Sequence, residues 1–377
     1  MTAASAGGTA ARPPRAGRAR WTEGLLATGA GRAVARNWAA CFLLVMLVVF
    51  SITGRGFLSL ANFQNVVHLQ TLPLLLAAAE TFVIISGGID LSVGFVAGLT
   101  SVMAATLMQR LAAGGASPGA AMALGAGAAL LLSLLPGLVN GLVITRFKVP
   151  PFIATLGMWG MANGLALRLC EGFPVAGLPP ELPRIGNGYL LWILPGQWVS
   201  FLGKPEGFPD ARVRELVRAV PGSLLLVGVV LGGLAFLLRR ARFGRHTYAI
   251  GGSLDAAVRA GIDVDRHLVR VYVLSSALAG LAGVFNVFQT GIGNYTTFGA
   301  MYELFAVAAV VIGGASLSGG KGRILGSAVG VLVLAFMENG LAISGVQPFY
   351  RYIVVGVLLI LAVVIDRLFP DLFEAGT

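Results

Sequence analysis

Long continuous apolar runs dominate the chain, and they leave little room for the alternating or one-sided patterns of water-soluble strands and helices. A membrane-spanning helix needs about 20 mostly apolar residues. Because the runs are continuous, spanning helices are predicted rather than the strands of a membrane barrel. The pattern predicts an all-α, polytopic transmembrane helical bundle of about ten spans. The ten runs are residues 37–53, 66–86, 91–109, 120–145, 150–169, 222–238, 268–288, 302–316, 324–342 and 347–366.

A long Pro- and Gly-rich segment, residues 170–221, separates the first five runs from the last five. Its apolar part, residues 189–202, is short and is broken by a Pro-Gly pair. With Trp192 and Trp198 at the level of the headgroups, this part is typical of an interfacial or re-entrant segment. The 5 + 5 arrangement is also typical of transporters with a duplicated fold.

Two Gly-rich stretches resemble each other, Ile-Ser-Gly-Gly-Ile-Asp-Leu-Ser at residues 85–92 and Ile-Gly-Gly-Ala-Ser-Leu-Ser at residues 312–318. They follow the second and the eighth run. Since they lie six spans apart, they do not fit a five-span repeat. We interpret them as independent uses of a Gly-rich helix break.

The composition agrees with lipid as the solvent. Of the 377 residues, 56% are hydrophobic and 11% are charged, whereas a water-soluble domain usually has about 25% charged residues. Such a chain cannot cover a water-facing surface with polar groups, so a soluble domain is excluded. The 53 glycines, about twice the average usage, allow helix backbones to approach closely in a membrane.

The N-terminus is basic and precedes an apolar run, as in a signal peptide. However, Thr53-Gly54-Arg55-Gly56 follows the run in place of a small-residue cleavage site, so we interpret the run as a retained first span. Residues 1–36 are predicted to form a basic cytoplasmic segment. It is expected to be disordered because Ala, Gly, Pro and Arg dominate its beginning.

The net charge of +11 is distributed unevenly. With both termini in the cytoplasm, 18 of the 27 Lys and Arg residues fall on that side, and the short outer loops hold only Arg55, Arg110 and Arg168. The positive-inside rule therefore predicts cytoplasmic termini, a cytoplasmic loop at 239–267 and a cytoplasmic tail at 367–377. The basic charge is interpreted as a topology signal and as lipid contact, not as a nucleic-acid interface.

The cysteines and histidines do not form a site in the sequence. Cys41 and Cys170 lie in or at the end of apolar runs and are interpreted as packing residues. His68, His246 and His267 are scattered and lack the spacing of metal ligands. We therefore predict no metal site and no catalytic residues, and the chain is not expected to be an enzyme.

The largest cytoplasmic segment, residues 239–267, contains a helix signal. Ser253 is a good N-cap, Asp255 falls in the first turn and Gly261 ends the helix. A helix of about two turns is not stable alone in water, so it needs a surface to dock on. Spacing alone favours equally a groove in a cytosolic partner and an amphipathic linker on the bilayer surface. The apolar face of the helix consists of Leu254, Ala257 and Val258.

Six stretches carry a family resemblance. The most distinctive are Ser-Gly-Gly-Ile-Asp-Leu-Ser-Val-Gly at 86–94 and Phe-Gly-Arg-x-x-Tyr-Ala-Ile-Gly-Gly at 243–252, the latter followed by Ala-Ala-x-x-x-Gly-Ile. The order and spacing of all six, over about residues 60–366, resemble ribose/xylose-type ABC sugar importer permeases, the binding-protein-dependent inner-membrane component. The remaining stretches are residues 137–141, 148–156, 303–304 with 311–320, and 338–341.

The resemblance implies a permease subunit in the inner membrane of a bacterium. Two permease chains, identical or paralogous, would form the pathway for a monosaccharide. A periplasmic sugar-binding protein would deliver the sugar and a cytosolic ABC ATPase would drive the transport. The permease would bind no cofactor, because ATP binds the ATPase partner. This agrees with residues 319–323, whose Gly-Gly-Lys-Gly-Arg lacks the spacing of a P-loop.

Two other classes of transporter remain as alternatives. Branched-chain amino acid or nucleoside ABC permeases share the Ala-Ala-x-x-x-Gly-Ile pattern, although the stretch at 87–92 favours sugar. An ion-driven secondary transporter would need acid relays inside the membrane and no ATPase.

The resemblance also implies site residues in two groups. For ATPase coupling these are Phe243, Gly244, Tyr248, Gly251, Gly252, Leu254, Asp255, Ala256, Ala257, Arg259, Gly261 and Ile262. For the translocation pathway or its helix breaks they are Gly87, Gly88, Asp90, Asn140, Glu303, Gly313, Gly314, Glu338, Asn339 and Arg351.

Polar residues inside the apolar runs are expensive in lipid, so each needs a reason. Asp90 is expected to cap the helix that follows it, and Glu80 is expected to pair within the bundle. Asn140 either bonds across helices or faces the pathway. Glu303 and Glu338 are candidates to face the pathway.

Two positions depart from the family pattern. Phe305 stands where the family often has the Asp of Glu-Leu-Asp, and Arg351 stands where it often has an amide. Both positions are expected near the pathway, so the sugar preference of the family does not transfer directly.

Overall fold

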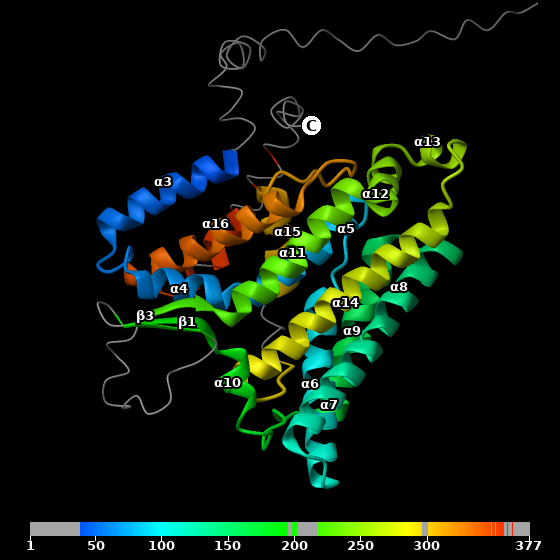
Figure 1. Ribbon diagram of the computed structural model, residues 1–377. Coiled ribbons are helices and arrows are strands. Elements are labelled where there is room, and N and C mark those ends of the chain that lie inside the picture. Colours follow the sequence, from blue (N-terminus) through cyan, green and yellow to red (C-terminus); the bar gives the residue numbers. More distant parts are fainter. Residues whose placement is uncertain are drawn as a thin grey trace, which may run out of the picture.

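The computed structural model describes residues 38–194, 198–201, 217–295, 301–347, 349–350, 352–357, 360 and 364 (Figure 1). The predictions for residues 1–36, for residues 367–377 and for Arg351 lie outside the described residues. The first helices are α3 (Trp38–Thr53), α4 (Leu60–Leu69), α5 (Thr71–Ile85), α6 (Val93–Ala113), α7 (Pro118–Leu132), α8 (Leu134–Arg146), α9 (Pro151–Cys170) and α10 (Leu182–Gly186). After a small sheet follow α11 (Gly222–Arg240), α12 (Arg242–Gly252), α13 (Leu254–Arg259), α14 (Val264–Thr290), α15 (Tyr302–Ile312) and α16 (Ile324–Ile343).

Five helices among the described residues are long and apolar enough to cross a membrane: α6, the continuous pair α7–α8, α11, α14 and α16. The pair α4–α5, bent by 46° at its break, is a sixth if it counts as one span. The helices α3 and α15 are apolar but shorter. The multi-pass architecture is therefore confirmed, and the count of ten spans stays a prediction.

The prediction of an all-α chain is wrong for part of residues 170–221. This segment contains β1 (Tyr189–Leu194), β2 (Trp198–Phe201) and β3 (Val217–Pro221), in the antiparallel order β2-β1-β3. Residues 189–202, predicted to be interfacial or re-entrant, thus supply two paired strands. The physical reason is that aromatic and β-branched residues favour strands, and paired strands satisfy backbone groups without a helix.

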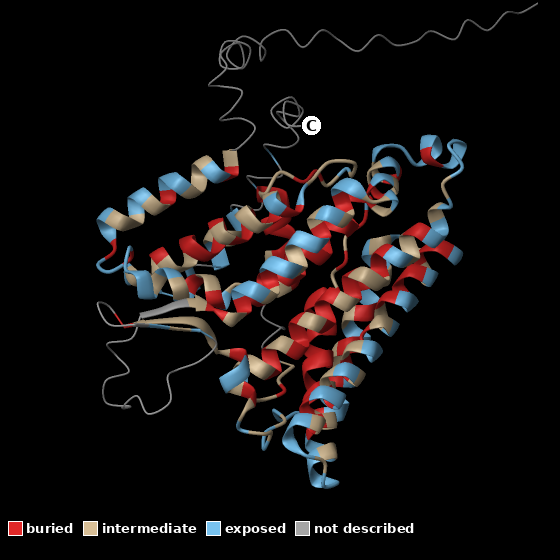
Figure 2. Cartoon of the chain, in the orientation of Figure 1, coloured by how far each residue is buried: buried red, intermediate tan, exposed pale blue. Residues whose placement is uncertain are grey.

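The core of the bundle lies around α5, α6 and α14. All 15 residues of α5 are buried, and Figure 2 shows buried residues gathered on α6 and the inner side of α14, while exposed ones follow α3, α7 and α11. Many exposed residues on those outer helices are large and apolar, such as Leu131, Val229 and Phe236. An apolar exterior is expected for a surface that faces lipid rather than water.

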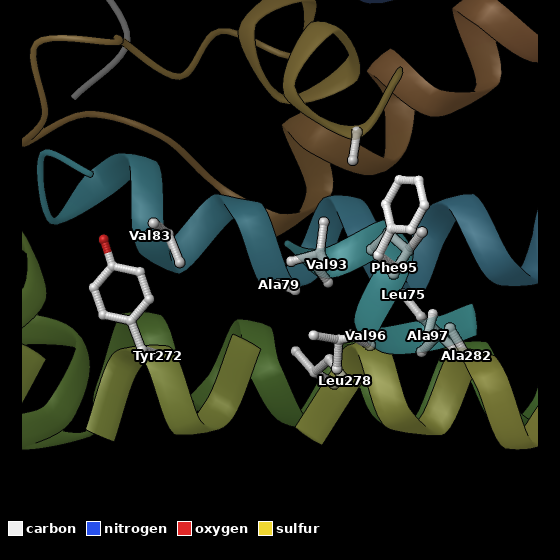
Figure 3. Packing of buried hydrophobic residues seen from close by; sticks show 14 of the residues in the cluster. Leu75, Ala79, Val83, Val93, Phe95, Val96, Ala97, Tyr272, Leu278 and Ala282 are labelled. Carbon is white, nitrogen blue, oxygen red and sulfur yellow. The ribbon is translucent and has the colours of Figure 1, made fainter. Parts of the chain in front are cut away.

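Glycines allow the central helix α14 to lie against its neighbours. A Cβ added to Gly137 on α8 would overlap the backbone of Tyr272, and one added to Gly280 on α14 would overlap Ser133. Close backbone approach through small residues is the usual way in which membrane helices pack. Figure 3 shows the resulting core, where Tyr272 points from α14 towards Val83 of α5.

Candidate functional site

The segment α12–α13 lies at one end of the bundle, and α10 lies at the opposite end (Figure 1). The predicted short helix is confirmed as α13. Its N-cap Ser253 accepts a hydrogen bond from the backbone N–H of Ala256 at 3.3 Å. Gly261 follows the helix with φ of +77°, a conformation that favours glycine. The exposed Asp255 lies in the first turn and Arg259 in the last turn, where their charges suit the helix dipole.

The apolar face of α13 differs in one residue from the prediction. Leu254 and Val258 are 53% and 58% exposed, whereas Ala257 is 2% exposed and turned inwards. Ala256 and Arg259 are exposed as well. Within this helix of six residues, Ala257 is the one buried side chain, so nearly the whole surface of the helix is exposed.

The longer helix α12 anchors this surface to the bundle. The buried residues Gly244, Thr247 and Ile250 repeat every three residues and form its inner face. The sequence analysis assigned residues 243–252 to the coupling segment but did not predict that they form a helix. The reason is that its apolar positions are few and are separated by Arg and His.

Phe243 connects α12 with two membrane helices. Its ring lies 5.8 Å from that of Phe82 on α5 and 4.7 Å from that of His267 on α14, measured between centroids. Thr247 and His267 are also hydrogen-bonded, with 2.9 Å between Oγ1 and Nε2. The segment is therefore fastened to α5 and α14 by side chains of α12.

Tyr248 fastens α12 to a third part of the chain. Its hydroxyl donates a hydrogen bond of 2.7 Å to the backbone carbonyl of Gly322, between α15 and α16. Burial raises the pKa of Tyr248 above its usual value near 10, although the charges of Arg323 and Arg239 oppose this shift. The phenol is protonated at physiological pH, as a tyrosine ordinarily is, and therefore donates this bond.

Asp90 lies in a buried hydrogen-bond cluster between membrane helices. Its Oδ1 accepts from the backbone N–H and the hydroxyl of Ser92, and its Oδ2 accepts from the hydroxyl of Ser275 on α14 at 2.8 Å. Asp90 does lie just before α6, where it was expected to cap the helix, but it acts indirectly. The N-cap of α6 is Ser92, and Asp90 holds that residue instead of bonding the first turn.

Asn140 joins the same cluster from α8. Its amide donates to the hydroxyl of Ser92 at 3.1 Å, so it bonds across helices, as one of its two interpretations predicted. Thr155 on α9 accepts from the backbone N–H of Leu91 at 3.2 Å and donates to the carbonyl of Ile89. The break between α5 and α6 is thus held from α8, α9 and α14.

Two buried glutamates lie near this cluster. Glu80 is fully buried on α5, and its Oε2 is 3.5 Å from the backbone nitrogen of Asp90. Glu303 at the start of α15 is buried and lies near Trp159 of α9. Within the described residues, Oε1 of Glu80 and Oε2 of Glu303 have no hydrogen-bond partner. Glu80 was expected to pair within the bundle, and only its Oε2 has a partner, the backbone nitrogen of Asp90.

The two helix breaks are alike. Gly87 and Gly314 have φ of +87° and +90°. Past the first break the N–H of Gly88 bonds to the carbonyl of Val83, and past the second the N–H of Ala315 bonds to that of Val310. Both are the same six-residue helix ending. Gly313 lies one residue earlier, where its backbone approaches Gly326 of α16 closely.

The remaining pathway candidates lie on α16. Glu338 is half-buried and lies near Tyr302. Asn339 exchanges two hydrogen bonds with Asn62 of α4, at 2.8 and 3.0 Å. This reciprocal pair gives Asn339 a structural partner, which the sequence could not identify because the two residues are 277 positions apart.

The amide pair gives a testable prediction for stability. Asn62→Ala and Asn339→Ala should each lower the thermal stability of the purified protein. The double variant should recover about 0.6 kcal/mol of coupling, since interhelical hydrogen bonds in membranes average that value. The measurement is a double-mutant cycle on thermal unfolding in detergent. Strictly additive losses would contradict the pairing.

One polar cluster at the opposite end was missed by the sequence. The two ring nitrogens of His68 lie 2.8 Å from the hydroxyl of Ser223 and 3.0 Å from the amide oxygen of Asn187. The amide nitrogen of Gln289 is also 3.0 Å from His68. The cluster joins α4, α10, α11 and α14. The members of this cluster are single polar residues at separate helix ends, so no local sequence pattern could predict the cluster.

The described cysteines and acids do not suggest bound metal. Cys41 and Cys170 are free thiols, half-buried and buried. No three His, Cys, Asp or Glu side chains in the described part of the chain gather closely enough to hold a metal ion.

Known proteins match nearly the whole chain. Residues 62–363 match the family described as branched-chain amino acid transport system / permease component. The chain is 37% identical to the ribose import permease protein RbsC of Bacillus subtilis over 327 residues, which cover 86% of this chain and 90% of that protein. It is 32% identical to the xylose transport system permease protein XylH of Haemophilus influenzae, covering 85% and 93%. It is 34% identical to the probable ABC transporter permease protein YphD of Escherichia coli, covering 86% and 87%. No solved structure matches with statistical significance.

Proposed function

Because this chain belongs to the branched-chain amino acid transport system / permease component family, we propose that it forms the membrane pathway of an ABC importer for a monosaccharide. It is a multi-pass transport component and not an enzyme. The observation that carries the sugar assignment is the identity of 32–37% to the ribose and xylose permeases over 85–86% of the chain. The same similarity favours the sugar importer over an amino acid permease or an ion-driven transporter.

The ATPase partner is proposed to bind at α13. In support, Leu254 and Val258 form an exposed apolar pair one helical turn apart, and Asp255 and Arg259 flank it with opposite charges. An apolar centre with a charged rim is typical of a protein interface. The alternative, a linker lying on the bilayer, would bury little apolar area, because Leu254 and Val258 are the exposed large apolar residues of α13 and membrane binding scales with that area.

The neighbouring helix α12 is proposed to transmit movement from the ATPase interface at α13 to the membrane helices. Phe243, Gly244, Tyr248 and Gly251 face the bundle, whereas Gly252, Gly261 and the half-buried Ile262 adjoin α13. ATP would bind the ATPase subunit, so the permease itself needs no cofactor.

The importer also needs a second permease chain, identical or paralogous, and a periplasmic binding protein. We place α12–α13 and both termini in the cytoplasm of a bacterium and the chain in its inner membrane, on the distribution of Lys and Arg. The binding protein would then meet the end that carries α10 and the sheet.

Among the pathway candidates, Glu303 and Glu338 are proposed to meet the sugar. Asp90, Asn140 and Asn339 bond to side chains of other segments, and we propose that they hold helices in place. Few strong anchors are expected in a pathway that must release its cargo.

The proposal is tested by reconstitution in proteoliposomes. The permease, the ABC ATPase and the binding protein encoded beside it are combined, and uptake of labelled ribose, xylose, galactose and leucine is measured. We expect uptake of a monosaccharide that needs ATP and the binding protein, and none with an ATPase that binds but cannot hydrolyse ATP. Uptake of leucine alone, or sugar uptake without ATP, would refute the proposal.

A further inference from the structure

The C-terminal end of α12 meets the first Gly-rich helix break, and the loop that follows the second one, through backbone alone. The backbone N–H of Gly320, in the loop before α16, donates a hydrogen bond of 2.8 Å to the carbonyl of Ile85, the last residue of α5. Gly251 lies against the same two groups. A Cβ added to Gly251 would overlap the carbonyl oxygen of Ile85 and lie 2.5 Å from the nitrogen of Gly320.

Neighbouring glycines continue the contact. A Cβ on Gly319 would lie 2.8 Å from the carbonyl oxygen of Gly251 and 3.2 Å from the Cα of Gly87. A Cβ on Gly320 would lie 2.9 Å from the Cα of Gly252. Three segments that are far apart in the sequence therefore touch without any side chain between them. We name this contact of Ile85, Gly87, Gly251, Gly319 and Gly320 the glycine junction.

Such a contact transmits displacement rather than absorbing it. Side chains can change rotamer when a helix shifts, but packed backbone has no such freedom, and interiors respond to small shifts by moving as units. The junction touches α5 and the loop between α15 and α16 together. Its residues Ile85 and Gly87 lie five and three residues before Asp90, and its residues Gly319 and Gly320 follow α15, which carries Glu303 in its first turn.

We propose that Gly251 and Gly320 are positioning residues that pass the movement of α12 at once to the helix break after α5 and to the loop that follows the break after α15, so that ATP hydrolysis and opening of the pathway stay coupled. This inference rests on the proposed function. The Tyr248 hydrogen bond to Gly322 holds the same loop against α12 and belongs to the same device.

The test compares Gly251→Ala with Gly233→Ala in the reconstituted importer. Both replace a glycine within a helix, but a Cβ at Gly233 on α11 has no atom within 4 Å. We expect Gly251→Ala to lower sugar transported per ATP hydrolysed by about 10-fold, with the ATPase still bound and hydrolysing. Gly233→Ala should keep the ratio of the unchanged protein.

A second variant covers the case in which Gly251→Ala does not fold. Tyr248→Phe removes one oxygen and should lower the same ratio by about 3-fold, while Tyr350→Phe, at an exposed tyrosine, should not. An unchanged ratio in Gly251→Ala, or in Tyr248→Phe where Gly251→Ala does not fold, would overturn the junction. If the unchanged complex takes up no sugar, the proposed function fails instead, so the two failures are distinguishable.

Discussion

Val258→Asp should abolish sugar uptake and release the ATPase while leaving the permease folded in the membrane. Val258 is 58% exposed on α13 and lies one turn from Leu254, so the substitution leaves the buried core of the chain unchanged. In the proposed interface, however, the new carboxylate would be buried without a partner. That costs about 3–5 kcal/mol, and ~3 kcal/mol corresponds to about 100-fold in an association constant.

The measurement is co-purification of the ATPase with tagged permease, together with uptake in proteoliposomes. Ala113→Asp is the matched control, because it adds the same side chain at an exposed position at the end of α6. It should leave binding and uptake within about two-fold, as surface substitutions usually do. If Val258→Asp binds the ATPase normally, α13 is not the docking surface.

The sequence predicted features that depend on neighbours in the chain. The cap at Ser253, the stop at Gly261 and the helix break at Gly87 are local, because each follows from one residue type and its backbone conformation. The sequence also indicated that Asn140 could form a hydrogen bond across helices. An amide in lipid must find a partner, although its identity as Ser92 was not predictable.

The sequence missed features that depend on distant parts of the chain. Ala257 was assigned to the exposed face because a short apolar helix has no inner side until it is docked. The strands at 189–201 were missed because the sheet is completed only by β3, which pairs with β1 across a long loop. The glycine junction was invisible for the same reason, since Gly251 and Gly320 carry no side chain whose pattern could reveal the contact.

The surroundings of the two Gly-rich breaks help to explain their similarity. The stretches at 85–92 and 312–318 share a helix ending, and the junction touches α5 directly and the loop after α15. The first stretch and the residues just after the second therefore both contact the C-terminal end of α12. This does not require a five-span repeat.

Asp90→Ala should prevent the accumulation of stable permease. Asp90 is 1% exposed and accepts three hydrogen bonds, from the N–H and hydroxyl of Ser92 and the hydroxyl of Ser275. Alanine would leave these donors buried without an acceptor, at about 1–3 kcal/mol each. Even a partial loss is large beside a total stability of about 5–15 kcal/mol. Asp90→Asn keeps one acceptor oxygen and should be milder.

Membrane yield and thermal stability in detergent measure this effect, and Asp263→Ala is the control. Asp263 caps α14 from an exposed position, so its loss should cost only about 1 kcal/mol. The comparison also separates two roles for Asp90. If Asp90 binds the sugar, its substitution should abolish uptake while the thermal stability of the protein stays unchanged. If Asp90 instead holds Ser92 and Ser275, its substitution should lower the stability first, and uptake only as a consequence.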